Sequence, residues 1–170
     1  MQGGQLPPET EKAWMAGIFE GEGGARIYRT KARKELSYWP AVQAISNTDP
    51  LLIKRVTAFL DQLGLRGSYW LRKNSNGRDK PGRGHHSLCF EVRIGSTKSI
   101  PIFLNAILPY LTGSKKTQAE LILAFIELRN SRPKRYRNQW TGKLGDECFA
   151  ADEALYRQQQ FRPKAALLQN

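Results

Sequence analysis

Cysteine, histidine and long hydrophobic runs are all scarce in this sequence of 170 residues. The only cysteines, Cys89 and Cys148, are too few for a disulfide framework and are not spaced as a zinc site. The apolar stretches are too short to span a bilayer, and the N-terminus lacks the basic and then apolar segments of a signal peptide. We therefore expect an intracellular protein, in the cytoplasm or in an organelle, that is not secreted and has no membrane partner.

Acidic residues are also few. The sequence has 15 Asp and Glu against 27 Lys and Arg, which leaves a net charge of +12 and a pI near 10.0. Hydrophobic residues make up 40% of the chain, enough for a core, which excludes a disordered basic tail. A folded domain this basic repels itself unless a polyanion binds it, and nucleic acid is the most common such partner.

The spacing of apolar residues alternates along the chain between the period of helices and that of strands. It predicts helices over 10–20, 50–63, 97–111, 115–128 and 146–160, and strands over 25–31, 36–46, 69–72 and 87–94. Thr10 is expected to cap the first helix, while Pro40 and Gln43 leave open which side chains of 36–46 face inward. The order predicts an α+β fold in which one antiparallel sheet has helices on a single face. We expect a flexible lead over 1–8, one domain over 9–160 and a basic tail over 161–170.

The uncovered face of this sheet has the side chains that DNA recognition uses. A twisted β-ribbon fits the major groove, where such groups donate to guanine edges, stack, or accept from cytosine. A solvated charged face is the alternative, but the net charge favours DNA. Arg33 and Lys73 lie near hairpin ends, where phosphate contacts are expected. The alternation places Arg26, Tyr28, Thr30, Trp70, Arg72, Glu91 and Arg93 on the uncovered face, and Ile27, Leu71, Phe90 and Val92 on the core face.

The segment 15–23, Met-Ala-Gly-Ile-Phe-Glu-Gly-Glu-Gly, is the most informative one. Gly17 and Gly21, with Ala13 and Ala16 nearby, leave a groove of small residues on a helix, which allows the helix to pack closely against a second copy of itself. In such a dimer the two Glu22 carboxylates come together, which favours a divalent metal between them and phosphodiester cleavage. The alternative is a glycine-rich helix end with two exposed glutamates.

This segment resembles the signature of the LAGLIDADG homing endonucleases. The resemblance continues through 47–52, Gly64, 108–111 and 115–119, so that residues 9–130 follow the αββαββα order of the family. It implies a saddle-shaped antiparallel sheet that binds DNA, with the helices on the other face. Only one copy of the motif is present, and members with a single motif act as homodimers.

The resemblance implies a site-specific endonuclease that cleaves both strands of a long, near-palindromic double-stranded DNA target. It further implies Mg²⁺ as the cofactor, 3′ overhangs in the product and an intron-encoded origin. The rival within the same fold is an RNA maturase that binds its host intron RNA without cleaving DNA. An intact Glu22 favours the nuclease, because splicing assistance needs no acid at a dimer axis.

Site residues are carried over from the family one by one. Glu22 matches the metal-binding acid, with Gly21 beside it, and Lys115 matches a basic residue that assists catalysis. A polar residue at the end of the second strand maps to Asn47 or Ser46, of which Asn47 is preferred. The residues expected at the dimer interface are Ala13, Ala16, Gly17, Phe19 and Glu20, the last with a mainly structural role.

Overall fold

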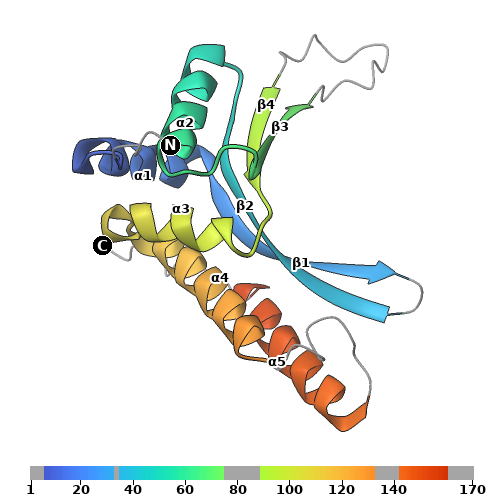
Figure 1. Ribbon diagram of the computed structural model, residues 1–170. Helices are drawn as coiled ribbons and strands as arrows, with labels where there is room; N and C mark the ends of the chain where they lie inside the picture. Colours follow the sequence, from blue (N-terminus) through green and yellow to red (C-terminus); the bar gives the residue numbers. More distant parts are fainter. Residues whose placement is uncertain (1–5, 33–34, 75–88, 133–141, 161–170) are drawn as a thin grey trace, which may run out of the picture.

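The structure is a computed structural model that describes residues 6–32, 35–74, 89–132 and 142–160 (Figure 1). Arg33, the two histidines and both proposed terminal segments other than residues 6–8 lie outside this description. The helices are α1 (Glu9–Glu22), α2 (Pro50–Gln62), α3 (Ser99–Ile107), α4 (Gly113–Ser131) and α5 (Gly142–Gln160), with a 3₁₀ turn η1 (Leu108–Tyr110) after α3. The strands are β1 (Gly24–Ala32), β2 (Glu35–Asn47), β3 (Tyr69–Asn74) and β4 (Cys89–Ile94).

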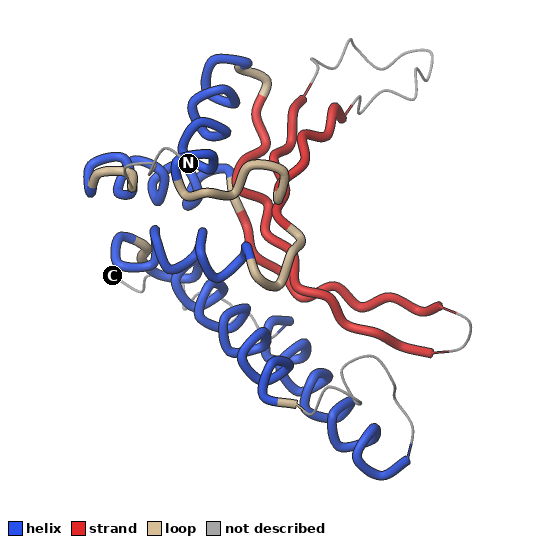
Figure 2. The backbone as a smooth tube through the Cα atoms, in the orientation of Figure 1, coloured by secondary structure: helices blue, strands red, loops and turns tan. Residues whose placement is uncertain are grey.

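The strands form one antiparallel sheet in the order β1-β2-β4-β3. The helices lie on one face of the sheet, and the hairpins β1–β2 and β3–β4 diverge, so the opposite face is curved and uncovered (Figures 1 and 2). We call this uncovered side the outer face. The arrangement confirms the α+β fold predicted from the sequence. Among the described residues, no helix combines the length and apolarity that crossing a membrane requires.

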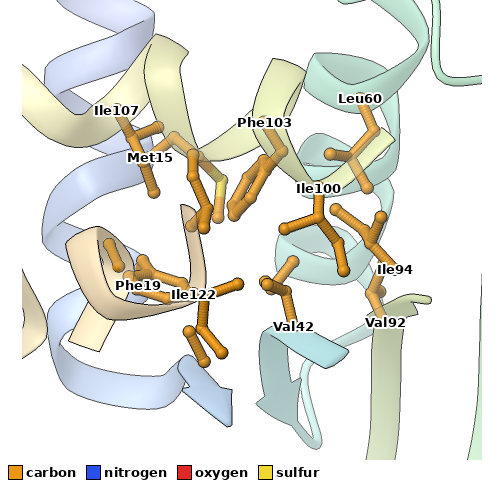
Figure 3. Close-up of a cluster of buried hydrophobic side chains, with 14 of the residues drawn as sticks. Met15, Phe19, Val42, Leu60, Val92, Ile94, Ile100, Phe103, Ile107 and Ile122 are labelled. Atoms are coloured by element: carbon orange, nitrogen blue, oxygen red, sulfur yellow. The ribbon is translucent and has the colours of Figure 1, made fainter. Parts of the chain in front are cut away.

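The core lies between the sheet and the helices (Figure 3). Phe19 of α1 meets Phe103 of α3 edge to face, with ring centroids 5.8 Å apart. Edge-to-face contacts of this kind suit the quadrupoles of aromatic rings. The helix-facing residues of three strands complete the core, among them Ile27, Val42, Val92 and Ile94, all at most 2% exposed. The apolar alternation predicted for β1 and β4 is confirmed at these positions.

Strand β2 explains why its inward residues could not be assigned from the sequence. A bulge between Gln43 and Ile45 shifts the register, so Val42, Ala44 and Ile45 are all buried. The pairing of β2 with β4 begins at Val42 and runs to Asn47. Pro40 precedes this paired segment, so its missing N–H interrupts no hydrogen bond to β4. The bulge breaks the alternation, whereas Pro40 keeps it, being buried in step with Tyr38 and Val42; the strand itself is continuous over 13 residues.

Two local predictions are wrong. Thr10 does not cap α1, because the helix begins at Glu9 and the carbonyl of Pro8 accepts the first hydrogen bonds, from the N–H groups of Glu11 and Lys12. Leu71 lies opposite the buried Val92 in the register and yet is 52% exposed. The reason is position, because β3 is an edge strand and the helical layer does not cover Leu71. By contrast, the helix predicted over 50–63 is present: Asp49 caps α2 through its side chain, and Gly64 ends the turn after it with a φ of +75°.

Helix α5 is held against the rest of the molecule by polar contacts. Asp152 is fully buried and pairs with Arg132 at 2.6 Å and with Arg129 at 3.8 Å, both from the end of α4. The Tyr38 hydroxyl of β2 donates to Glu153, and burial together with this hydrogen bond raises the pKa of Tyr38 to about 12. Helix α5 thereby supports the long β1–β2 hairpin on its helical side (Figure 1).

Candidate active site

The end of α1 presents a carboxylate at the point where the helix meets the sheet. Glu22 is the last residue of α1 and is exposed, and β1 begins two residues later. No basic residue lies in the last turn of the helix, so its carbonyl groups and the Glu22 carboxylate together make a negative end. Such an end favours a cation.

Gly23 makes the tight junction between α1 and β1 possible. A Cβ built on Gly23 would lie 2.8 Å from the carbonyl oxygen of Phe19 and 2.9 Å from its Cα. Its N–H donates to that same carbonyl at 3.0 Å. Glycine is therefore required here by close approach of the backbone, and this packing determines where Glu22 is placed.

Lys115 of α4 lies beside this junction. Its ammonium donates to the carbonyl oxygen of Gly23, although the two residues are 92 positions apart in the sequence. The side chain is half-buried, and its Nζ lies 5.8 Å from the centre of the Phe19 ring. Folding thus brings Lys115 to the residue that directly follows Glu22, so the two residues picked out by the family resemblance lie at the same junction.

Glu20 joins the last turn of α1 to the first turn of α4. Its Oε1 accepts hydrogen bonds from the Thr112 N–H at 2.6 Å and from the Thr112 hydroxyl at 2.8 Å. These bonds, with the nearby charge of Lys115, hold the pKa of Glu20 below its ordinary value. The carboxylate is therefore occupied within its own protomer, in agreement with a structural role.

The structure places Gln43, and not Asn47, against the end of α1. The Gln43 amide donates to the Glu22 carbonyl oxygen at 3.4 Å. Asn47 lies opposite Phe90 in the register, and its Oδ1 instead accepts the N–H of Asp49 at 2.9 Å, at the start of α2. The alternative, Ser46, is on the outer face but has its Oγ 3.1 Å from Cys89 Sγ. Sequence reasoning missed Gln43 because the β2 bulge concealed which side chains share a face with Glu22.

The outer face carries most of the side chains that were expected there. Arg26, Tyr28, Thr30, Trp70 and Arg72 are exposed, and Gln43 and Arg93 are adjacent in the register. The indole ring of Trp70 packs against Gly95. A Cβ added to Gly95 would lie 2.6 Å from this ring, so glycine leaves the room that the ring occupies.

Glu91 departs from the expectation for this face. It is only 7% exposed, and its Oε2 lies 2.6 Å from Nη2 of Arg93, so it holds a neighbouring arginine rather than projecting outward. Lys73 lies opposite Phe90, which is the register position of the helical face rather than the outer face. Glu91 is therefore not placed to read DNA bases as predicted, while the phosphate contact expected of Lys73 stays a prediction.

The expected dimer surface on α1 is only partly exposed. Ala16 and Phe19 are 1% and 0% exposed, so they belong to the core of the protomer, and their assignment to the interface is wrong. The exposed residues Ala13, Gly17 and Gly21 follow one another at four-residue spacing on a single side of the helix. A Cβ built on Gly17 or Gly21 would meet nothing within 4 Å. We call these three residues the small-residue stripe.

Glu22 is the exposed acid at the end of α1. Among residues 6–32, 35–74, 89–132 and 142–160, no three His, Cys, Asp or Glu side chains are grouped as a metal site. A carboxylate and the carbonyl groups of a helix end are hard oxygen ligands, which suit Mg²⁺ or Ca²⁺.

No protein-family model and no curated protein matches the sequence. Solved structures do match. The homing endonuclease I-CvuI, solved with DNA in the presence of Mg in one case and Ca in another, is 16% identical, with a TM-score of 0.65 over 89% of this chain and 81% of that one. The group I intron-encoded homing endonuclease I-CeuI, complexed with DNA, is 16% identical, with a TM-score of 0.63 over 93% of this chain and 69% of that one.

A third match is the LAGLIDADG homing endonuclease I-GzeII in complex with its DNA target, 16% identical, with a TM-score of 0.65 over 85% of this chain. The chain spans 43% of the length of I-GzeII. The fold is therefore that of the LAGLIDADG homing endonucleases, and the resemblance predicted from the sequence is confirmed.

Proposed function

We propose that this chain, which has the LAGLIDADG fold, is a site-specific DNA endonuclease of that family. The observation that carries the proposal is the position of Glu22, which is exposed at the end of α1 with Lys115 donating to the adjacent Gly23 carbonyl. The basic outer face begins at the same junction, with Arg26 two residues into β1. A duplex on that face would bring its phosphates to Glu22.

The active form in this proposal is a homodimer. The small-residue stripe lets two α1 helices approach closely, and Glu22 follows directly after Gly21 at its end. A twofold axis along the stripe brings the two Glu22 carboxylates together and presents two outer faces in opposite directions along the duplex. Such a dimer would read a near-palindromic target and cut both strands, leaving 3′ overhangs.

In the proposed mechanism Glu22 and the Gly21 carbonyl would hold a divalent metal, Mg²⁺. Its bound form would supply activation of water and stabilisation of the leaving oxygen in phosphodiester hydrolysis. Lys115, which donates to the Gly23 carbonyl, would place a positive charge at this junction and offset the negative charge that develops on the phosphate. Gln43 donates from its amide nitrogen to the Glu22 carbonyl oxygen and so supports the end of α1 that carries the acid.

The test separates binding from cleavage. Glu22→Gln keeps the size of the side chain and removes its charge. We expect it to bind the target duplex and to cut it at least about 100-fold more slowly, because loss of a group that merely orients a metal ligand already costs about 10- to 100-fold. The substrate is the DNA made by joining the sequences that flank the reading frame, as expected for an intron-encoded enzyme, and cleavage is followed with added Mg²⁺.

Glu120→Gln, which removes an exposed acid from the middle of α4, is the matched control and should cut like the wild type. Cleavage by Glu22→Gln at the wild-type rate would contradict the mechanism. Splicing assistance on the host intron RNA without DNA cleavage by the wild type would assign the protein to the maturase function instead.

A further inference from the structure

Two aromatic side chains form an exposed pair on the β1–β2 hairpin. Tyr28 and Trp39 are direct partners in the register and are 45% and 51% exposed. Their strand neighbours Ile27 and Tyr38 are buried on the helical side, so both rings stand on the outer face. The pair lies on the part of β2 that precedes Val42, where β2 no longer pairs with β4 and the hairpin extends beyond the rest of the sheet (Figure 2).

The polar group of Trp39 is already used within the protein. Its indole N–H donates to the Ser37 hydroxyl at 3.2 Å, and that hydroxyl is 2.8 Å from the hydroxyl of Thr30 across the strands. The indole N–H is the single hydrogen-bonding group of tryptophan. What Trp39 presents on the outer face is therefore carbon surface and not a donor for a base edge.

Trp39 is also held in place before any ligand arrives. The Arg129 guanidinium lies 5.4 Å from the centre of the Trp39 ring, and Arg129 donates to the Tyr38 carbonyl at 2.7 Å. Arg129 is itself mostly buried and lies 3.8 Å from Asp152. A ring held in this way loses little conformational entropy when a ligand covers it, which favours a binding role over a loosely exposed side chain.

Resting on the function proposed above, we infer that Tyr28 and Trp39 form an apolar step that reads the 5-methyl group of thymine in the major groove. Among the bases, only thymine presents an apolar group in that groove. The exposed Arg26 precedes Tyr28 by two residues on the same face, and with the net charge of +12 it favours a polyanion rather than an apolar protein surface as the occupant. The pair contributes specificity for thymine at defined positions of each half-site.

The test removes single methyl groups from the DNA. A target duplex is selected from a randomised pool with the full-length protein, and each thymine is then replaced in turn by uracil, which keeps every hydrogen-bonding group. Binding is measured without divalent metal so that the strands stay intact. We expect about fourfold weaker binding at one or more thymines of each half-site, the factor for exposing one methyl-sized group.

Trp39→Ala should lose this sensitivity to uracil, whereas Tyr28→Phe, which keeps the ring, should retain it. Ile102→Ala is the matched control, because Ile102 is a 47% exposed apolar residue on helix α3, and it should behave like the wild type. Tyr28→Ala serves as the second truncation should Trp39→Ala fail to fold by circular dichroism.

The inference is overturned if replacing thymine by uracil weakens binding of the wild type at no position. It is also overturned if that replacement weakens binding of Trp39→Ala and of Tyr28→Ala as much as it weakens binding of the wild type. Concentration-dependent self-association that Trp39→Ala abolishes, with no effect of uracil, would assign the pair to protein contacts. Failure of the wild type to select any duplex from the pool would instead contradict the proposed function.

Discussion

Thr112 donates two hydrogen bonds to one oxygen of Glu20, from its N–H at 2.6 Å and from its hydroxyl at 2.8 Å. Thr112 is the N-cap residue of α4, and Glu20 lies in the last turn of α1, so the contact joins the two helices that carry Glu22 and Lys115. The first acid of the motif thus stabilises the arrangement in which the second acid is presented.

The Glu20 contact predicts a pH dependence of stability. The pKa of Glu20 is lower in the folded protein, so its carboxylate stabilises the fold above about pH 4.5, the ordinary value, and this contribution is lost as the pH falls further. Glu20→Gln should remove that part of the acid-induced loss, measured by denaturant unfolding over a pH series. Thr112→Val should reduce the acid-induced loss of stability, because it removes one of the two hydrogen bonds to Glu20. Thr117→Val removes a different hydroxyl, within α4, and should leave that loss unchanged. The contact would be refuted if Glu20→Gln lost as much stability at low pH as the wild type does.

Two neighbouring glycines of the motif should respond differently to alanine. Gly23→Ala puts a Cβ 2.8 Å from the Phe19 carbonyl oxygen and should lower the free energy of unfolding by about 1–3 kcal/mol, as overpacking usually does. Gly21→Ala meets nothing within 4 Å, and alanine favours a helix, so the protomer should keep its stability or gain up to about 1 kcal/mol. Denaturant unfolding of both variants checks the contrast, and equal destabilisation would show that the junction is not as tight as the structure has it.

The small-residue stripe predicts the effect of added bulk on self-association. Ala13→Leu should weaken the proposed dimer by about 1–3 kcal/mol, because the larger side chain keeps the two α1 helices apart. Ala124→Leu, the same change at an exposed position of α4, should have no effect. Sedimentation equilibrium gives the dissociation constants. If Ala13→Leu and Gly17→Leu both had the dissociation constant of the wild type, the interface would have to lie elsewhere on the protomer.

The buried ion pair of α5 predicts a large loss of stability. Asp152→Ala leaves Arg132, 6% exposed at its side chain, without its partner carboxylate and should cost about 3–5 kcal/mol of unfolding free energy. Glu9→Ala removes the acid of a surface pair with Lys12, where the Glu9 side chain is 72% exposed, and should cost under about 1 kcal/mol. Comparable losses in the two variants, measured by denaturant unfolding, would contradict the burial of Asp152.

The order of helices and strands was predictable because the signals for each element are local. The apolar spacing of α2, its cap at Asp49 and the glycine after it lie within about 15 residues, and the alternation around Ile27 and Tyr28 is uninterrupted. The burial of Leu71 was not predictable, because it depends on how far the helical layer extends over an edge strand.

The motif and the family resemblance singled out Glu22 and Lys115 along the chain, and their roles stay predictions, although the structure places both at the α1–β1 junction. Gln43 was not, because its proximity to Glu22 follows from a β-bulge and from strand register, which join residues 21 positions apart. The same holds for Glu91. The sequence alternation suggested a DNA contact, but in the structure its carboxylate is buried and pairs with Arg93. Side-chain chemistry is thus a property of the linear chain, whereas which groups meet depends on long-range packing that no local pattern encodes.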